Sequence, residues 1–370
     1  MEIGSIYEIN PKVIADDSVD KGVVRLTEVE KYNKKYIRYT QSGREAIAWA
    51  LRSLEISEPG IRKECLLPAY MCDSVFFPFV HAGWKLHFYH IGKNFQASEE
   101  ELRSLVEHIR PGLLFIHPYY GVDTWKPMRS LLKEWRGWGI HVMEDVTQSY
   151  YLEGAGLEAD YVIGSLRKWY PIPDGGFVAS DLPISMEELP AGGEFSMEKW
   201  KILTSKWEYL HGNGSEAERK ARKEEYLKHN RVMEEWLDEW ESVHEISEIS
   251  KKLLRSEDEE HSKKCRNTNY RYLSEALQEF EYLITIFPTP EEGIAPLYFP
   301  IYVKEREKLQ EFLRKKDIYA PVLWPVGKEN KEHLSEAERY IYENLLVLPM
   351  DQRYGENEMK RMIEAIREYT

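Results

Sequence analysis

An acid and a lysine in the stretch from His141 to Ser180 are of types that could act together in one reaction. Asp145 ends an apolar run that begins at His141, and Lys168 follows a second apolar run over residues 159–164. Each run is typical of a short buried strand bounded by polar or glycine residues. Because ligands of an open α/β sheet bind at the carboxyl ends of strands, we expect both side chains to face one pocket.

The pairing of these two residue types suits pyridoxal phosphate (PLP). A carboxylate holds the pyridine nitrogen protonated, which makes the ring an electron sink, and a lysine amine forms a Schiff base with the aldehyde and later moves a proton. The competing interpretation is an ordinary turn acid and a solvated surface lysine, the usual state of such residues. The residues around Asp145 and Lys168 favour the chemical interpretation.

Two motifs around this pair resemble those of a known family. The segment 144–149, Glu-Asp-Val-Thr-Gln-Ser, is similar to the Glu-Asp-x-x-Gln segment of DegT-like aminotransferases. These are fold type I PLP enzymes, most of which aminate nucleotide-linked keto sugars. Lys168 is followed six residues later by Asp174 and then by Gly175-Gly176, which is similar to the family's lysine, acid and Gly-Gly. The resemblance extends in the same order from about Tyr39 to the C-terminus.

The order of the expected elements predicts the fold. Strand and helix patterns alternate from residue 65 to residue 180, which indicates a mostly parallel sheet with right-handed crossovers. The resemblance implies an α/β fold with a mostly parallel sheet sandwiched by helices, as in fold type I PLP transferases. We expect an N-terminal arm at 1–38, a large PLP-binding domain at 39–250 and a smaller α+β C-terminal domain at 251–370.

A helix that begins after Ser42 is the expected seat of the cofactor phosphate. Ser42 is a typical N-cap, with Glu45 as its capping-box partner. The free N–H groups and the positive end of such a helix attract a phosphate, and Arg44 could add a charged fork. The resemblance implies that Ser42-Gly43-Arg44 hold the PLP phosphate. Ser165, three residues before Lys168, is the further candidate for that contact.

Contacts to the ring and the substrate follow from the same resemblance. The segment 68–70 is similar to the family's Pro-Ala-aromatic segment, but the position of its ring-stacking aromatic falls on Cys72. Either Tyr70 supplies the ring face or the Cys72 thiol packs against the ring. The other alternative is that Tyr70 is simply an aromatic residue of the core. The resemblance implies that Gln148 hydrogen-bonds the phenolic oxygen of PLP and that Tyr120 lines the substrate side. His117, at a strand end, is either an acid–base group or a structural histidine.

Composition excludes several classes of protein. The 370 residues carry a formal charge of −14, which argues against a nucleic-acid partner, since such proteins show a basic stripe. Three separate cysteines give neither a disulfide framework nor a zinc pattern, so we expect no metal. We find no signal peptide and no run long enough to span a membrane. We therefore expect a cytoplasmic enzyme, and by resemblance a homodimer with its active site near the interface.

The expected function is transfer of an amino group from glutamate to a keto sugar carried on a nucleotide. One alternative is a PLP enzyme of another reaction type. The family's sugar dehydratases carry histidine in place of the lysine, so Lys168 argues against that variant. Another alternative is a non-catalytic or regulatory PLP-fold dimer, because the stacking aromatic is missing. The same alternative is supported by the position of Asn269-Tyr270-Arg271, which lies too far along the chain to be the family's motif that reaches the partner's phosphate.

Overall fold

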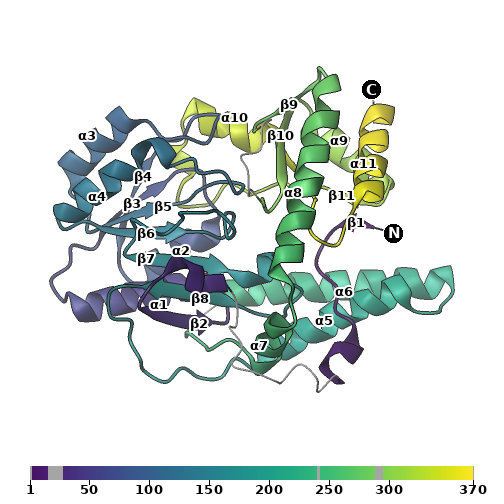
Figure 1. Ribbon diagram of the computed structural model, residues 1–370, viewed down its shortest axis with the longest axis horizontal. Coiled ribbons are helices and arrows are strands. Elements are labelled where there is room, and N and C mark those ends of the chain that lie inside the picture. The colour runs from purple at the N-terminus through teal and green to yellow at the C-terminus, as the bar shows by residue number, and fades with distance from the viewer. Residues whose placement is uncertain (1, 16–27, 240–241, 288–294, 370) are drawn as a thin grey trace. The chain divides into compact units, whose positions relative to one another are not determined.

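The computed structural model describes residues 2–15, 28–239, 242–287 and 295–369 (Figure 1). Residues 16–27 of the predicted arm therefore lie outside the described residues. The chain forms two compact units, each made of separate segments. The first comprises Met1–Ser5, Glu58–Val162 and Asp258–Thr370, and the second comprises Ile6–Ser57 and Ile163–Glu257. The domain boundaries expected near residues 38 and 250 stay predictions.

The first unit contains the parallel strands β3 (Glu64–Pro68), β4 (Lys85–Tyr89), β5 (Leu113–Ile116) and β6 (His141–Asp145). Strand β3 pairs in parallel with β4 and β5, and β5 pairs in parallel with β6. All four residues of β5 are buried and apolar, as expected for parallel strands that are covered on both faces. The crossovers contain α2 (Asp73–His81), α3 (Glu99–Ile109), η4 (Lys126–Met128) and α4 (Arg129–Gly137).

The second unit contains β2 (Tyr36–Thr40), which pairs antiparallel with β8 (Gly176–Ser180). Strand β7 (Tyr161–Ser165) is divided between the units, and the strand order of the whole sheet is β2-β8-β7-β6-β5-β3-β4. This order confirms the predicted α/β fold with a mostly parallel sheet. Besides a helical hairpin, this unit contains η1 (Pro11–Ala15), η3 (Glu28–Tyr32), α1 (Gly43–Ser57), η5 (Leu166–Lys168), η6 (Leu237–Glu239) and α7 (Glu248–Arg255).

A long helical hairpin in the second unit consists of α5 (Glu194–His211) and α6 (Glu216–Trp236) (Figure 1). A polar segment, Gly-Asn-Gly-Ser at 212–215, separates the two helices. Ser215 caps α6, and Glu218 reaches back to complete a capping box. The two helices and the turn after α6 share a small apolar core of Phe195, Ile202, Tyr226, Met233 and Leu237. The hairpin is thus held by its own packing.

The C-terminal part of the first unit is α+β, as predicted. Strand β10 (Phe299–Val303) pairs antiparallel with β9 (Leu283–Thr285) and with β12 (Leu345–Leu348). Strand β1 (Ile3–Gly4) pairs with β11 (Ile318–Tyr319). The remaining elements are α8 (Glu259–Ala276), η7 (Leu277–Glu279), α9 (Arg306–Lys315), η8 (Lys331–His333), α10 (Glu336–Asn344) and α11 (Glu356–Tyr369). No described helix is both long and apolar enough to cross a membrane.

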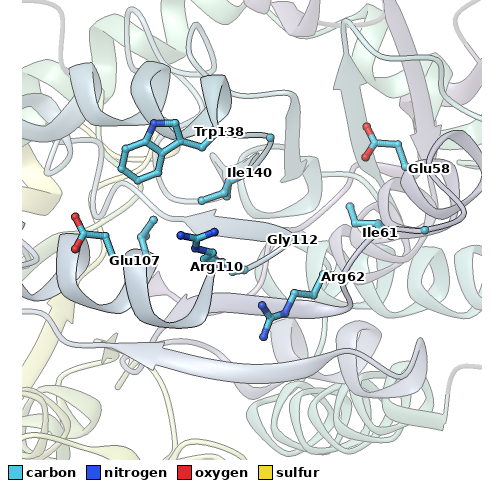
Figure 2. Close-up of a pocket in the computed structure, with 12 residues that line it drawn as sticks. Glu58, Ile61, Arg62, Glu107, Arg110, Gly112, Trp138 and Ile140 are labelled. Atoms are coloured by element: carbon cyan, nitrogen blue, oxygen red, sulfur yellow. The ribbon is translucent and has the colours of Figure 1, made fainter.

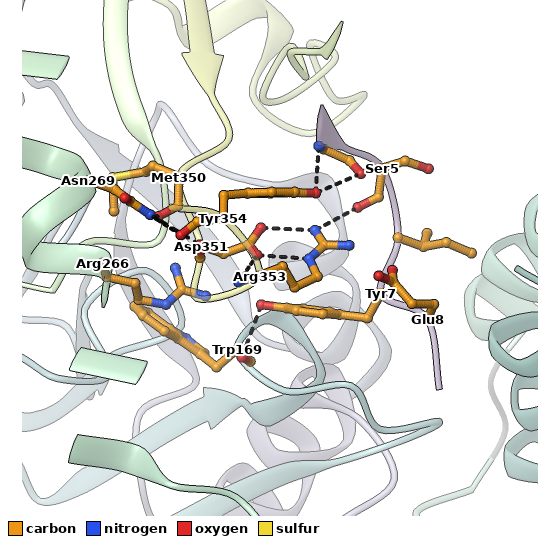
Figure 3. Close-up of polar contacts among 12 residues, drawn as sticks. Ser5, Tyr7, Glu8, Trp169, Arg266, Asn269, Met350, Asp351, Arg353 and Tyr354 are labelled. Atoms are coloured by element: carbon orange, nitrogen blue, oxygen red, sulfur yellow. Dashed lines mark hydrogen bonds and ion pairs between the residues drawn. The ribbon is translucent and has the colours of Figure 1, made fainter. Parts of the chain in front are cut away.

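Asn269 of the Asn-Tyr-Arg segment has a structural role in this part of the fold (Figure 3). It is buried, and its Nδ2 donates to Met350 O at 3.1 Å, Asp351 O at 3.4 Å and Tyr354 O at 2.8 Å. The two hydrogens of this amide are therefore shared among three carbonyl oxygens of the turn between β12 and α11, and Asn269 holds that turn in place.

Replacing Asn269 with alanine is expected to destabilise the chain by about 2 to 4 kcal/mol, because buried carbonyls lose their donor. Denaturant unfolding measures the change. The control is Thr268→Ala, an exposed position on the same helix, which should change little. Equal stability of the two variants would contradict the role assigned to the Asn269 amide.

Candidate functional site

The two carboxylates that end β6 have different surroundings. Glu144 is fully buried and pairs with Arg129, with Nη2 at 3.2 Å from Oε1, and it accepts from Gly156 N at 2.9 Å. Asp145 instead meets His117, because successive side chains of a strand point to opposite faces. Burial raises the pKa of Glu144, and the charge and hydrogen bonds of Arg129 oppose that shift. Glu144 is therefore held by Arg129 and Gly156, and the chemical role of Asp145 stays a prediction.

Asp145 is nearly enclosed, with 3% of its surface exposed. Its Oδ1 accepts from Thr147 N at 2.9 Å, and its Oδ2 lies 3.2 Å from His117 Nδ1. Within the described residues, both ring nitrogens of His117 are buried without a hydrogen bond of acceptable geometry. His117 Nδ1 therefore contacts the Asp145 carboxylate without a well-aligned hydrogen bond.

Gln148 and Tyr120 lie together on the same unit. Gln148 Oε1 accepts from Tyr120 N at 3.2 Å, and Ser149 Oγ accepts from Gly121 N at 3.3 Å. These bonds tie the loop after β5 to the loop after β6. Gln148 Nε2 and Tyr120 Oη are both buried, and among the described residues neither makes a hydrogen bond of good geometry. Burial raises the pKa of Tyr120, and the neighbouring Tyr70 and Gln148 side chains oppose that shift.

Tyr70 and Cys72 are both placed near the start of α2, and their environments differ. Tyr70 is fully buried, donates to Leu323 O at 2.5 Å and packs against Trp324, with the ring centroids 5.3 Å apart. Cys72 is half-buried at the N-cap of α2, with its sulfur 3.0 Å from Ser74 Oγ. Stacking of either residue on a cofactor ring stays a prediction.

The sequence interpretation missed Trp324. Its ring lies 6.1 Å from the ring of His117 in an edge-on arrangement, and it also packs on Tyr70. Trp324 thus brings a large half-buried aromatic to the histidine beside Asp145. It lies in a loop without regular structure between β11 and η8, so no periodic pattern could have marked it.

In the second unit, α1 begins as predicted. Ser42 is buried, and its Oγ accepts from Glu45 N at 3.3 Å, as an N-cap does. The capping-box role predicted for Glu45 is wrong. Its Oε1 pairs instead with His244 Nδ1 at 3.3 Å and accepts from Gln41 Nε2 at 3.3 Å. Burial raises the pKa of Glu45, against the opposing effect of His244.

Gly43 and Ser165 are brought into direct contact. A Cβ on Gly43 would lie 3.2 Å from Ser165 Cβ, so the end of β7 packs on the first turn of α1. This places the Ser165 side chain beside the N-terminal N–H groups of the helix. Ser42, Gly43 and Ser165 therefore form one cluster with the composition of a phosphate seat.

Arg44, the third residue predicted to hold the phosphate, binds residues of η6. Its Nη1 donates to Leu237 O and lies 2.7 Å from Asp238 Oδ1, both at the end of the α5–α6 hairpin. The structure thus shows Arg44 tying α1 to η6. A contact between Arg44 and a phosphate stays a prediction, and it would have to compete with Asp238.

Gly176 lets β8 pass close to the start of α1. A Cβ on Gly176 would lie 2.3 Å from Ser42 O and 2.7 Å from Gly43 N, a separation that no side chain tolerates. Gly175 N donates to Gln41 O at 2.7 Å on the same approach. The Gly-Gly pair noted in the sequence thus permits the geometry of the Ser42-Gly43 turn.

We expect Gly176→Ala to destabilise the fold by about 1 to 3 kcal/mol, because the Ser42 backbone must move. It should also weaken PLP binding about tenfold or more if the Ser42-Gly43 turn holds the phosphate. Unfolding and PLP titration measure the two effects. Gly60→Ala is the matched control, because a Cβ there meets nothing within 4 Å. Unchanged PLP affinity in Gly176→Ala would argue against this turn as the seat.

Lys168 ends the short turn η5, directly after β7, and is exposed. Asp174, six residues later, is fully buried and accepts from Ser247 Oγ at 2.5 Å, Ser247 N at 3.0 Å and the Ser250 hydroxyl. Burial raises the pKa of Asp174, while these hydrogen bonds lower it. Asp174 therefore anchors the start of α7. The role of Lys168 as the nucleophile stays a prediction.

Comparisons by sequence give no match to a protein-family model or to a curated protein. Solved structures do match along the whole chain. Spr1654 of Streptococcus pneumoniae, a putative sugar aminotransferase in its PLP form, is 15% identical, with a TM-score of 0.69 over 100% of this chain and 98% of that chain. Helicobacter pylori PseC, an aminotransferase of pseudoaminic acid biosynthesis, is 14% identical, with a TM-score of 0.68 over 100% and 99%.

A DegT DnrJ EryC1 StrS aminotransferase from Brucella abortus is 16% identical, with a TM-score of 0.62 over 98% of this chain and 91% of that chain. The chain has the fold of the DegT-like aminotransferases. At such low identity the likeness concerns the path of the backbone, and function has to be argued from side chains.

The first unit contains a cavity of about 710 Å³ (Figure 2). It is lined by the segments that precede β3, β5 and β6, including Arg62, Gly112 and Ile140. It therefore lies at the amino ends of these strands, whereas Asp145 is at the carboxyl end of β6. Its charged lining is balanced, with Arg62 and Arg110 against Glu58 and Glu107.

Proposed function

We propose that this chain is a PLP-dependent aminotransferase. The observation that carries the proposal is the buried Asp145 with His117 at 3.2 Å, followed three residues later by Gln148, whose buried amide nitrogen makes no hydrogen bond of good geometry among the described residues. A carboxylate beside a histidine and an amide donor fit the ring nitrogen and the phenolic oxygen of PLP. When bound, PLP supplies an aldehyde and an electron-accepting ring.

The residues of the first unit would orient the ring. Asp145 would hold a proton at the pyridine nitrogen, and His117 would restrain the carboxylate and keep water from it. Gln148 Nε2 would donate to the phenolic oxygen. Tyr70, Cys72 and Trp324 are the candidates for the ring face. Tyr120, held by Gln148, would line the substrate side.

The residues of the second unit would bind the phosphate and move the proton. Ser42, Gly43 and Ser165 present a hydroxyl-lined helix start, which suits a dianionic phosphate. Lys168 Nζ would link covalently to the cofactor and then take and return the proton at the substrate carbon. Asp145 and Lys168 belong to different units, and their action on one cofactor is part of the proposal.

We also propose the substrates and the setting of the reaction. The amino donor would be glutamate, and the acceptor would be a keto sugar carried on a nucleotide, the reaction class of the DegT-like enzymes that the sequence resembles. The protein would act in the cytoplasm as a homodimer with its active site near the interface. Light scattering of the purified chain would give the oligomeric state.

An absorbance spectrum of the purified holoenzyme tests the proposal. Adding glutamate should replace the visible band of the bound cofactor with a band of shorter wavelength, and keto-sugar nucleotides should restore it. 2-Oxoglutarate should appear in an amount equal to that of the bound cofactor converted. A bound cofactor whose spectrum does not respond to any amino donor would favour the alternative of a non-catalytic PLP-fold dimer. Glutamate-dependent loss of water or another leaving group would favour a different PLP reaction.

A further inference from the structure

The segment 244–247 of the second unit contacts the chain on both sides of the predicted phosphate seat. Before the first turn of α1, Gln41 N donates to His244 O at 3.0 Å. Before the glycine pair that leads into β8, Asp174 accepts from Ser247 N at 3.0 Å and from Ser247 Oγ at 2.5 Å. One short segment therefore holds the two stretches of chain that frame the seat.

Glu45 is a fully buried acid in the first turn of α1, and His244 is the titratable group in contact with it. Glu45 Oε1 lies 3.3 Å from His244 Nδ1, and it accepts from Gln41 Nε2 at 3.3 Å. Glu45 Oε2 is buried and makes no hydrogen bond of good geometry among the described residues. An ionised carboxyl group in such surroundings is costly unless an opposite charge lies beside it. The ionisation of Glu45 therefore depends on the charge of His244.

The basic side chains nearest to this acid along the chain and in the unit have partners of their own. Arg44 lies 2.7 Å from Asp238. Arg167 and Lys199 both bind Glu234, with two parallel contacts from the guanidinium at 2.9 and 3.1 Å and one from the amine at 2.6 Å. Among the described residues, the histidine is thus the cation in contact with the buried acid of α1.

Folding changes the proton affinity of both members of the pair. Burial raises the pKa of Glu45; the hydrogen bond and charge of His244 oppose this shift, and the charge of Asp174 adds to it. The hydrogen bond with Glu45 raises the pKa of His244; burial opposes this shift, and the charge of Glu45 adds to it. The other ring nitrogen, Nε2, lies 3.3 Å from the uncharged Ser242 Oγ. The folded chain therefore holds a proton at this pair more tightly than the unfolded chain does.

We propose that Glu45 and His244 form a proton-dependent clamp on the first turn of α1 and act as positioning residues for the phosphate seat. While His244 is protonated, the pair is neutral overall and holds the turn to the segment 244–247. Loss of that proton leaves an uncompensated buried carboxylate in the turn, which weakens the turn and repels an anionic phosphate. The inference deepens the proposed function, on which the part that concerns phosphate rests.

Urea unfolding of the full-length, cofactor-free chain at several pH values tests the clamp. A group whose pKa is raised by folding contributes stability that is lost as the pH rises through its folded pKa, and both groups act in this direction. From pH 6.5, the usual pKa of histidine, to about pH 8.5, the unfolding equilibrium constant of the wild-type chain should rise about threefold or more relative to that of Glu45→Gln/His244→Gln.

The double variant removes both charges, so it leaves no unpaired buried acid and should fold. His229→Gln and Glu235→Gln, at exposed positions of α6, are the matched controls and should keep the pH profile of the wild-type chain. The same pH profile in the wild-type chain and in the double variant would overturn the inference.

Pyridoxamine phosphate reports on the seat, because it carries the phosphate but has no aldehyde to react with Lys168. Its affinity for the wild-type chain should fall about threefold or more over the same pH range, relative to its affinity for the double variant. Parallel losses of stability and affinity would support the inference, and a pH-independent ratio of the affinities would overturn it. If the compound does not bind the wild-type chain at all, the proposed function fails, and the unfolding profile still decides the clamp.

Discussion

Replacing Lys168 with alanine is expected to abolish both the visible absorbance of the bound cofactor and the glutamate half-reaction. The amine at this position is the proposed covalent attachment point and the proposed proton carrier, and alanine can do neither. Loss of a nucleophile that also acts as the base lowers kcat by roughly ten-thousandfold or more. The fold should survive, because residue 168 is exposed at the end of η5.

Lys199 is the second amine to be checked in this experiment. Lys199 is buried, and burial lowers its pKa to about 8, so its amine is partly neutral near physiological pH. The experiment therefore reduces the wild-type protein and Lys168→Ala with borohydride, in buffer free of amines, and maps the modified peptide. Lys201→Ala, an exposed lysine on α5, is the control that should keep the adduct. An adduct on Lys199 in either protein would refute the assignment of Lys168.

Asp145→Asn is expected to lower kcat by roughly a hundredfold to a thousandfold while PLP still binds. The amide keeps the size of the side chain and can still accept from Thr147 N. It cannot hold a proton on the pyridine nitrogen, so the ring would lose its capacity to accept electrons. Steady-state kinetics with glutamate, together with the PLP dissociation constant, would separate these two effects.

The neighbouring carboxylate supplies the control for Asp145. Glu144→Gln removes the charge that faces Arg129, which is then left half-buried with fewer carboxylate partners. Its main effect should be lower stability, of about 1 to 3 kcal/mol, with kcat kept per folded molecule. If Glu144→Gln lost kcat and Asp145→Asn kept it, the two acids would have been assigned in the wrong order.

The sequence was sufficient to predict the strands and the helix that carry the candidate residues. Apolar runs predicted strands β6 and β7, with Asp145 at the end of β6 and Lys168 shortly after β7, as the structure has them. The helix after Ser42 begins at Gly43 as predicted. These features depend on residues a few positions apart, through periodicity, capping and glycine, so a linear pattern records them.

Partners far apart in the chain were decided by the tertiary structure alone. Glu45 fits a local capping box, but folding brings His244, 199 residues away, to its carboxylate. Arg44, which the sequence predicted to contact the phosphate, likewise pairs with Asp238, 194 residues away. The Trp324 ring beside His117 and the cations on Glu234 have no signal in the sequence. Which charge neutralises a buried group depends on the elements that pack against it, and a one-dimensional pattern does not contain that packing.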